Sequence, residues 1–152
     1  MTYKKGIKME HWVIRKLKDL ADIERAKKNK IYKKGSFVLQ VAASKGDMFY
    51  LYEDQKVADK YVVFTVKEGI NSKYLFHLIN LQIDKILYLT LHGLNIDPNE
   101  LENVKIKFHP DIETQNFITN IFDTIDKKMN LELRTKQALK DLDKWHKDKI
   151  FC

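Results

Sequence analysis

Hydrophobic residues recur at helical spacing near the start of the chain. Beginning at Trp12, apolar side chains occupy positions 13, 17, 20 and 23, which places them on roughly one face of a helix. The following segment, 25–34, is rich in lysine and ends at Gly35, a residue typical of turns. The pattern predicts a short basic leader over 1–11, an amphipathic helix, and then a basic loop beside the first strand.

Three stretches in the middle of the chain, 37–41, 48–52 and 61–66, are rich in β-branched and aromatic residues. This composition suits a pleated, half-buried surface, and polar turn-forming residues separate the stretches, so we predict three strands. A fourth strand is predicted over 104–108, where apolar and polar positions alternate until Pro110 ends the pattern.

Helices are predicted in the second half of the chain. Asn71 and Ser72 can cap a helix that continues to Ile83, followed by a shorter segment over 86–91 and a turn over 95–98. From Asp111 to Lys149 there is neither Pro nor Gly, which permits one helix of about 39 residues, or about 58 Å.

Apolar residues along this long segment form two stripes. The first has the 4-3-4 spacing of a coiled-coil seam and consists of Ile118, Phe122, Ile125 and Met129; the second consists of Leu139, Leu142 and Trp145. Glu132 and Lys136 fall at seam positions between them, so the register shifts or the helix breaks near Asn130. We interpret both stripes as an interface for a partner helix. The alternative is a hairpin folded back on its own domain.

The elements together predict an α/β fold, in which a small domain with a mixed β-sheet plus helices precedes a long C-terminal helix. Charge adds to this picture, because the chain of 152 residues has a net charge of +7 that is not evenly spread. Residues 1–34 contain twelve Lys or Arg against four Asp or Glu, whereas the remaining residues contain sixteen against seventeen. A local basic excess is what a surface that contacts phosphates needs. The alternative is a solvated, lysine-rich face that serves solubility.

No catalytic constellation stands out in the sequence. The five glycines form no phosphate-binding loop, and the five histidines lack the spacing or paired cysteines of a zinc site. Asp47 with Asp54-Gln55-Lys56 loosely resembles the acid, acid, lysine set of metal-dependent nucleases, although turn chemistry explains the same residues. Cys152 stands alone, and neither a signal peptide nor an uninterrupted apolar run is present. We therefore expect a soluble, cytoplasmic, non-catalytic protein without a metal or cofactor.

Candidate nucleic-acid contacts come from the basic stretch and the strands beside it. Lysines suit phosphates, whereas side chains that donate and accept hydrogen bonds suit base edges. The phosphate candidates are Lys27, Lys28, Lys30, Lys33, Lys34 and Lys45, and the base-edge candidates are Arg25, Gln40, Ser44 and His92. Tyr50 and Tyr52 either contact bases as well or pack within the fold.

Three stretches, taken in order, resemble the specificity subunit of type I restriction-modification systems. Residues 12–27 are similar to its opening Trp, its Leu-x-Asp-aliphatic core and its basic turn. Residues 93–110 are similar to its glycine-containing loop and alternating strand, and residues 110–118, continuing to Asp126, resemble the start of its conserved helix. The resemblance implies a chain that reads double-stranded DNA and directs an adenine methyltransferase, which binds S-adenosylmethionine, and through it a restriction subunit.

The family's full subunit has two target-recognition domains and two spacer helices, whereas this chain has one of each. Its resemblance is therefore to half a subunit, with a recognition domain over 12–109 and a spacer and docking helix over 110–152. Two copies paired through the helix would restore the bipartite arrangement. The alternatives are an interaction protein from a mobile element that diverts or inhibits a host methyltransferase without binding DNA, a metal-dependent nuclease, and a nucleic-acid binder without a methyltransferase partner.

Overall fold

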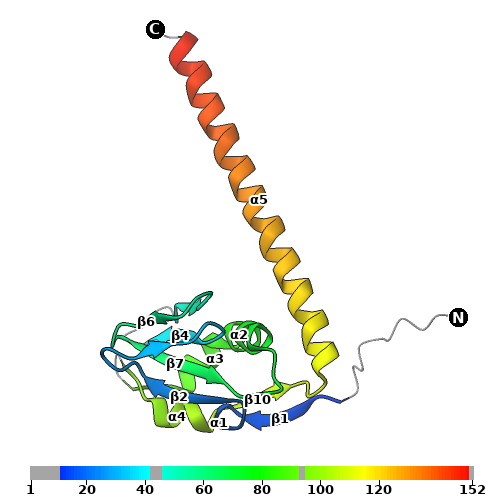
Figure 1. Ribbon diagram of the computed structural model, residues 1–152. Coiled ribbons are helices and arrows are strands. Elements are labelled where there is room, and N and C mark those ends of the chain that lie inside the picture. The colour runs from blue at the N-terminus through cyan, green and yellow to red at the C-terminus, as the bar shows by residue number, and fades with distance from the viewer. Residues whose placement is uncertain (1–10, 42–45, 93–94, 151–152) are drawn as a thin grey trace, which may run out of the picture. The chain divides into compact units, whose positions relative to one another are not determined.

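The computed structural model describes residues 11–41, 46–92 and 95–150 (Figure 1). The chain divides into two compact units, residues 1–118 and residues 119–152. The strands are β1 (Val13–Lys16), β2 (Ala21–Arg25), β3 (Ile31–Tyr32), β4 (Phe37–Gln40), β5 (Met48–Tyr50), β6 (Gln55–Lys56), β7 (Tyr61–Val66), β8 (Leu91–His92), β9 (Asn95–Ile96) and β10 (Lys105–Phe108). The helices are α1 (Leu17–Leu20), α2 (Ser72–Leu81), α3 (Ile83–Thr90), α4 (Pro98–Asn103) and α5 (Ile112–Ile150).

A four-stranded sheet in the order β2-β7-β4-β5 forms the centre of the first unit. Three two-stranded pairs, β1-β10, β3-β6 and β8-β9, accompany it. Strands predicted over 37–41, 48–52 and 61–66 are confirmed as β4, β5 and β7. Every pairing among the described residues is antiparallel, which refines the expected mixed sheet.

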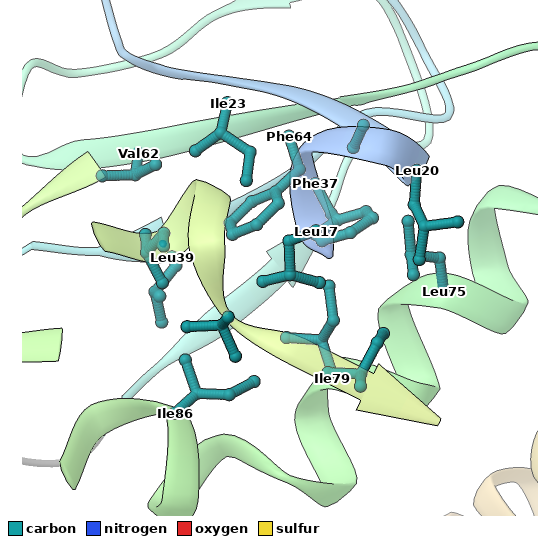
Figure 2. Close-up of a cluster of buried hydrophobic side chains, with 14 of the residues drawn as sticks. Leu17, Leu20, Ile23, Phe37, Leu39, Val62, Phe64, Leu75, Ile79 and Ile86 are labelled. Atoms are coloured by element: carbon teal, nitrogen blue, oxygen red, sulfur yellow. The ribbon is translucent and has the colours of Figure 1, made fainter. Parts of the chain in front are cut away.

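Both faces of the central sheet are covered, and alternate residues of β4 and β7 point to opposite faces. Phe37 and Phe64 stack with ring centroids 4.9 Å apart in the larger core, together with side chains of α1, α2 and α3 (Figure 2). Val38 and Val63 point the other way, into a smaller cluster with Tyr32 and Leu51. Because both faces are buried, β4 has a continuous apolar run instead of an alternating one. Burial of each large apolar side chain contributes about 1.5–3 kcal/mol.

The prediction of an amphipathic helix that begins near Trp12 is wrong, because only one helical turn, α1, forms there. Residues 13–25 form β1, the four-residue α1 and β2. In β2, Ala21 and Ile23 are buried and Asp22 is exposed, which is the period of a strand. Val13 pairs with Phe108, and Ile23 pairs with Phe64. These long-range pairings give the backbone hydrogen bonds and burial that override the local helical spacing.

The second half of the first unit follows the predictions more closely. Asn71 caps α2, its side chain accepting a hydrogen bond from the Tyr74 backbone N–H at 3.0 Å. The turn predicted over 95–98 is instead β9 and the start of α4, where Asp97 accepts from the Asn99 N–H at 2.9 Å and Pro98 is the first helical residue. The strand predicted over 104–108 is confirmed as β10, with Ile106 and Phe108 buried.

The long C-terminal helix is confirmed as α5, which runs for 39 residues without a break. Its first turns belong to the first unit, where Thr114 and Gln115 are buried. Every residue from 124 to 149 is exposed, and because the segment is one unbroken helix, the alternative in which it forms a hairpin is wrong. Among the described residues, the helices lack the combination of length and apolar character that a membrane span requires.

Candidate nucleic-acid interface

The register of the central sheet brings distant basic residues to one end of it. Strands β2 and β4 finish at Arg25 and Gln40, while β7 begins there, because Gln40 pairs with Tyr61 and Arg25 pairs with Val62. Lys60 immediately precedes β7, and the loop after β2 carries Lys27. We name Arg25, Lys27, Gln40 and Lys60 the sheet-end cluster.

Hydrogen bonds fix the loops that form the sheet-end cluster. The Arg25 Nε donates to the Asp59 carbonyl oxygen at 3.0 Å. The Ala26 N–H donates to the Tyr61 carbonyl at 2.9 Å, and the Val41 N–H donates to the Lys60 carbonyl at 2.8 Å. The turn before β7 is thereby tied to the ends of both β2 and β4. Positive charge and an amide therefore lie at one end of the sheet, and these are the groups that suit phosphates and base edges.

Glu24 offsets part of the charge in the basic stretch. Its carboxylate forms ion pairs with Lys30 and, at 3.2 Å, with Lys27. The hydrogen bond from Lys30, together with that from Lys27, lowers the pKa of Glu24 despite its partial burial, and the carboxylate in turn raises the pKa of Lys30. The carboxylate therefore partly neutralises the field of both lysines. Lys28 lies exposed on the same loop.

Lys33 and Lys34 lie at the other end of β3, in a turn that leads into β4. The Asp54 side chain accepts a hydrogen bond from the Lys34 N–H at 2.8 Å, and the Gly35 N–H donates to the Leu51 carbonyl at 2.9 Å. Gly35 has φ = +91°, which a glycine adopts without strain. The basic stretch predicted as one loop is thus divided into two groups by β3. Within the described residues, Asp47 and Asp54 belong to no group of three side chains close enough to share a metal ion.

The remaining candidate residues have different positions. Ser44 and Lys45 lie outside the described residues. The backbone of His92 is in β8, paired with Asn95. Lys60 was not among the residues predicted from the sequence to contact DNA. It could be identified only by its position just before β7, the strand that pairs with β4. That pairing joins residues 21 to 27 positions apart and cannot be read from local patterns.

The apolar side chains of the two predicted helix stripes are largely accessible. In α5, Ile125 and Met129 are 47% and 56% exposed, and Leu139, Leu142 and Trp145 are 61%, 52% and 50% exposed. Ile118 and Phe122 are partly buried. Since the helix is continuous, the two stripes differ by a register shift and not by a break. At about 100° per residue, Leu142 lies about 120° around the helix from Ile118.

Residues 24–141 match the model of the type I restriction modification DNA specificity domain. The fold is similar to the S subunit of the type I restriction-modification system from M. genitalium, with a TM-score of 0.69 at 14% identity over 86% of this chain and 42% of that one. It is also similar to the HsdS subunit from Thermoanaerobacter tengcongensis, with a TM-score of 0.68 at 13% identity over 88% of this chain and 42% of that one.

A third similar chain comes from a structure that describes complex assembly and conformational transition of the type I R-M system. Its TM-score is 0.71 at 14% identity, over 88% of this chain and 43% of that one. This chain therefore spans about two fifths of the solved subunits' length. No curated protein matches the sequence.

Proposed function

Because this chain belongs to the type I restriction modification DNA specificity domain family, we propose that it binds double-stranded DNA and directs a partner methyltransferase to a target sequence. The resemblance noted in the sequence is thereby confirmed, and membership places the chain among recognition components and not among enzymes. We further propose that residues 12–109 read DNA and that residues 110–152 hold partners. S-adenosylmethionine would bind the methyltransferase, which would connect this chain to a restriction subunit in the cytoplasm.

The sheet-end cluster is the observation that carries the DNA-binding proposal. Arg25, Gln40 and Lys60 come from three separate strands or turns, and the hydrogen bonds around them hold the backbone before any ligand binds. A preformed surface loses less conformational entropy on binding than a mobile one. We assign phosphate contacts to Lys28 and Lys60 first, with Lys27, Lys30, Lys33, Lys34 and Lys45 contributing, and base-edge contacts to Arg25 and Gln40, with Ser44 and His92 as further candidates.

A fluorescence anisotropy titration with a labelled duplex of mixed sequence tests this proposal. Lys28→Ala and Lys60→Ala should each weaken binding to all sequences alike and reduce the slope of log affinity against log salt by about one unit. Lys107→Ala, on the exposed side of β10, is the matched control and should leave the slope unchanged. Unaltered affinity in the double variant of Lys28 and Lys60 would show that the surface lies elsewhere.

The exposed stripes of α5 support a homodimer in which two copies present two recognition domains. Met129→Asp places a charge in the first stripe and should shift the mass measured by light scattering from dimer to monomer at micromolar concentration. Asn130→Asp adds the same charge about 100° away on the helix and should leave the dimer intact. A monomeric mass for the unmodified chain, alone and with methyltransferase, would refute the dimer.

Co-purification with a type I methyltransferase, followed by mapping of methylated adenines, tests whether this chain directs the methyltransferase to a target sequence. We expect a stable complex whose methylation pattern changes when Arg25 or Gln40 is replaced, since loss of one base contact costs about 1–3 kcal/mol and relaxes one position. A complex that forms but neither binds nor methylates DNA would instead support the interaction protein that diverts or inhibits the methyltransferase.

A further inference from the structure

An exposed aromatic ring on the first unit is held in a fixed orientation by its neighbours. Tyr52 is 72% exposed, yet its ring centroid lies 5.0 Å from that of Tyr50 in an edge-to-face arrangement. The Lys73 Nζ lies 5.3 Å from the Tyr52 ring centroid and 5.8 Å from that of Tyr50. We name Tyr50, Tyr52 and Lys73 the aromatic–lysine cluster. Ring pairing and cation–π contact each restrict the motion of the exposed ring.

The aromatic–lysine cluster is anchored to the core through α2. The Tyr50 hydroxyl and the Ser72 Oγ are 2.6 Å apart, and the Tyr50 ring lies 5.7 Å from the Phe76 ring. Ser72 is the first residue of α2 and Phe76 packs against the larger core. An exposed tyrosine that only filled space would not need this support, whereas a contact residue gains from being ordered before its ligand arrives.

The same cluster adjoins the basic turn of Lys33 and Lys34. The Gly35 N–H donates to the Leu51 carbonyl and the Lys34 N–H donates to the Asp54 side chain, so the turn is tied to residues one before and two after Tyr52. Across the turn, a side chain at Gly35 would lie 3.5 Å from the Ser72 Oγ, so the turn also meets the start of α2. Lys33 and Lys34 are exposed. Two exposed lysines therefore lie in a turn that is hydrogen-bonded to the segment carrying the preoriented ring, at the end of β3 remote from the loop that carries Lys27 and Lys28.

We propose that the aromatic–lysine cluster and Lys33 and Lys34 form a second contact surface for double-stranded DNA, which rests on the proposed function. Lys33 and Lys34 bind backbone phosphates, and the Tyr52 ring packs against a sugar or the methyl edge of a thymine between them. Lys73 is a positioning residue that holds the ring. Duplex DNA is favoured over a protein partner because the ring is bordered by lysines that complement phosphate charge, and because the basic stretch links this surface to the sheet-end cluster.

Photo-crosslinking of the full chain to a duplex that contains 5-bromouracil in place of thymine tests the proposal. We expect the crosslinked peptide to contain Tyr52. In anisotropy titrations with a labelled duplex of mixed sequence, Tyr52→Ala should weaken binding about tenfold while leaving the salt slope unchanged, as an aromatic contact without charge does. Tyr88→Ala, which removes an 87% exposed ring from α3, is the matched control and should bind like the unmodified chain.

Variants of Lys73 test whether a cation at this position orients the Tyr52 ring. Lys73→Ala should reduce both crosslinking at Tyr52 and affinity, and Lys73→Arg should restore both because guanidinium also packs over aromatic rings. Thermal unfolding of each variant checks that it folds. Tyr52→Phe keeps the ring and should retain binding, so it tests the contact even where Tyr52→Ala loses stability.

Three results would overturn the inference. If Lys28→Ala weakens binding but Tyr52→Ala does not and no crosslink reaches Tyr52, the proposed function stands and the second surface does not. If Tyr52→Ala leaves duplex binding intact but weakens binding of purified methyltransferase, the cluster is a protein interface. If the unmodified chain binds no duplex, the inference and the proposed function fail together.

Discussion

Replacement of Gln115 tests the junction at which α5 joins the first unit. The Gln115 side chain is fully buried; its Oε1 accepts a hydrogen bond from the Asn71 N–H at 2.9 Å, and its Nε2 donates to the His109 carbonyl at 2.8 Å. One side-chain amide thus pairs with a backbone N–H at the start of α2 and with a backbone carbonyl just after β10. Gln115→Leu keeps much of the volume but leaves both backbone groups without this partner.

The expected loss follows from the cost of leaving buried polar groups unpaired. Each such group costs about 1–3 kcal/mol, and the Asn71 N–H lies in a partly buried site where water relieves some of that cost. We therefore expect Gln115→Leu to lower the free energy of unfolding by about 2–4 kcal/mol. That is a large share of the stability of an ordinary domain.

Urea unfolding followed by tryptophan fluorescence measures this loss. The chain has two tryptophans, so a Trp145→Phe background leaves Trp12 as the reporter. Its ring lies edge-on to His109 at 5.3 Å, next to the junction. Gln137→Leu is the matched control, because it removes an exposed hydrogen bond to Asp141 within α5 and should cost under about 0.5 kcal/mol. Equal midpoints and slopes for the two variants would refute the assignment of a structural role to Gln115.

Three further predictions concern other parts of the chain. Gly46→Ala should lower the free energy of unfolding by about 2–4 kcal/mol in urea unfolding, because Gly46 has φ = +63° and an added Cβ would lie 2.7 Å from side-chain carbons of Ile83 and Leu87. Gly69→Ala is the control: Gly69 has φ = +81°, but an added Cβ would meet no atom within 4 Å, so the loss should be only about 1–2 kcal/mol. Glu24→Gln should strengthen duplex binding at low salt several-fold in anisotropy titrations, because it releases Lys27 and Lys30, and weaker binding would contradict this account. Because the folded-state pKa of Glu24 is lowered, its carboxylate adds a small stability above the unfolded-state pKa near 4.5, and the unmodified chain loses this stability as pH falls through the folded-state value. Glu24→Gln should lack this pH-dependent contribution, which urea midpoints from pH 7 to 3 measure. Leu142→Asp should leave the light-scattering mass of the proposed dimer unchanged under conditions in which Met129→Asp lowers it, and equal loss in both variants would show that one partner follows both stripes.

Local composition was sufficient to predict some elements and insufficient for others. Strands β4 and β7 have runs of β-branched and aromatic residues that suit burial on both faces, and α2 has both a capping asparagine and helical spacing. Residues 13–25 have helical spacing too, but their hydrogen-bond partners lie in β10 and β7, far along the chain. The tertiary pairings decide such a segment, and nothing within it reveals them.

The same limit applies to the candidate interface. Lysine density identified the stretch from Arg25 to Lys34, but not that Glu24 pairs with two of its lysines or that a short strand divides it. The register of β4 with β7 places Lys60 beside Gln40. The hydrogen bond from the Lys34 N–H to Asp54 brings the segment of Tyr52 to the turn of Lys33 and Lys34. Charge counted along a sequence measures how much is present, whereas binding depends on how much remains uncompensated on one face.

The register shift in α5 constrains what the helix can bind. A straight partner that follows Ile125 and Met129 would meet Glu132 and Lys136 next, at positions where a coiled-coil seam requires apolar side chains. Leu142 and Trp145 lie on another side of the same unbroken helix, about half exposed. Because burying either stripe leaves the other accessible, the helix suits two partners better than one, which agrees with a proposal in which a second copy and a methyltransferase both bind it.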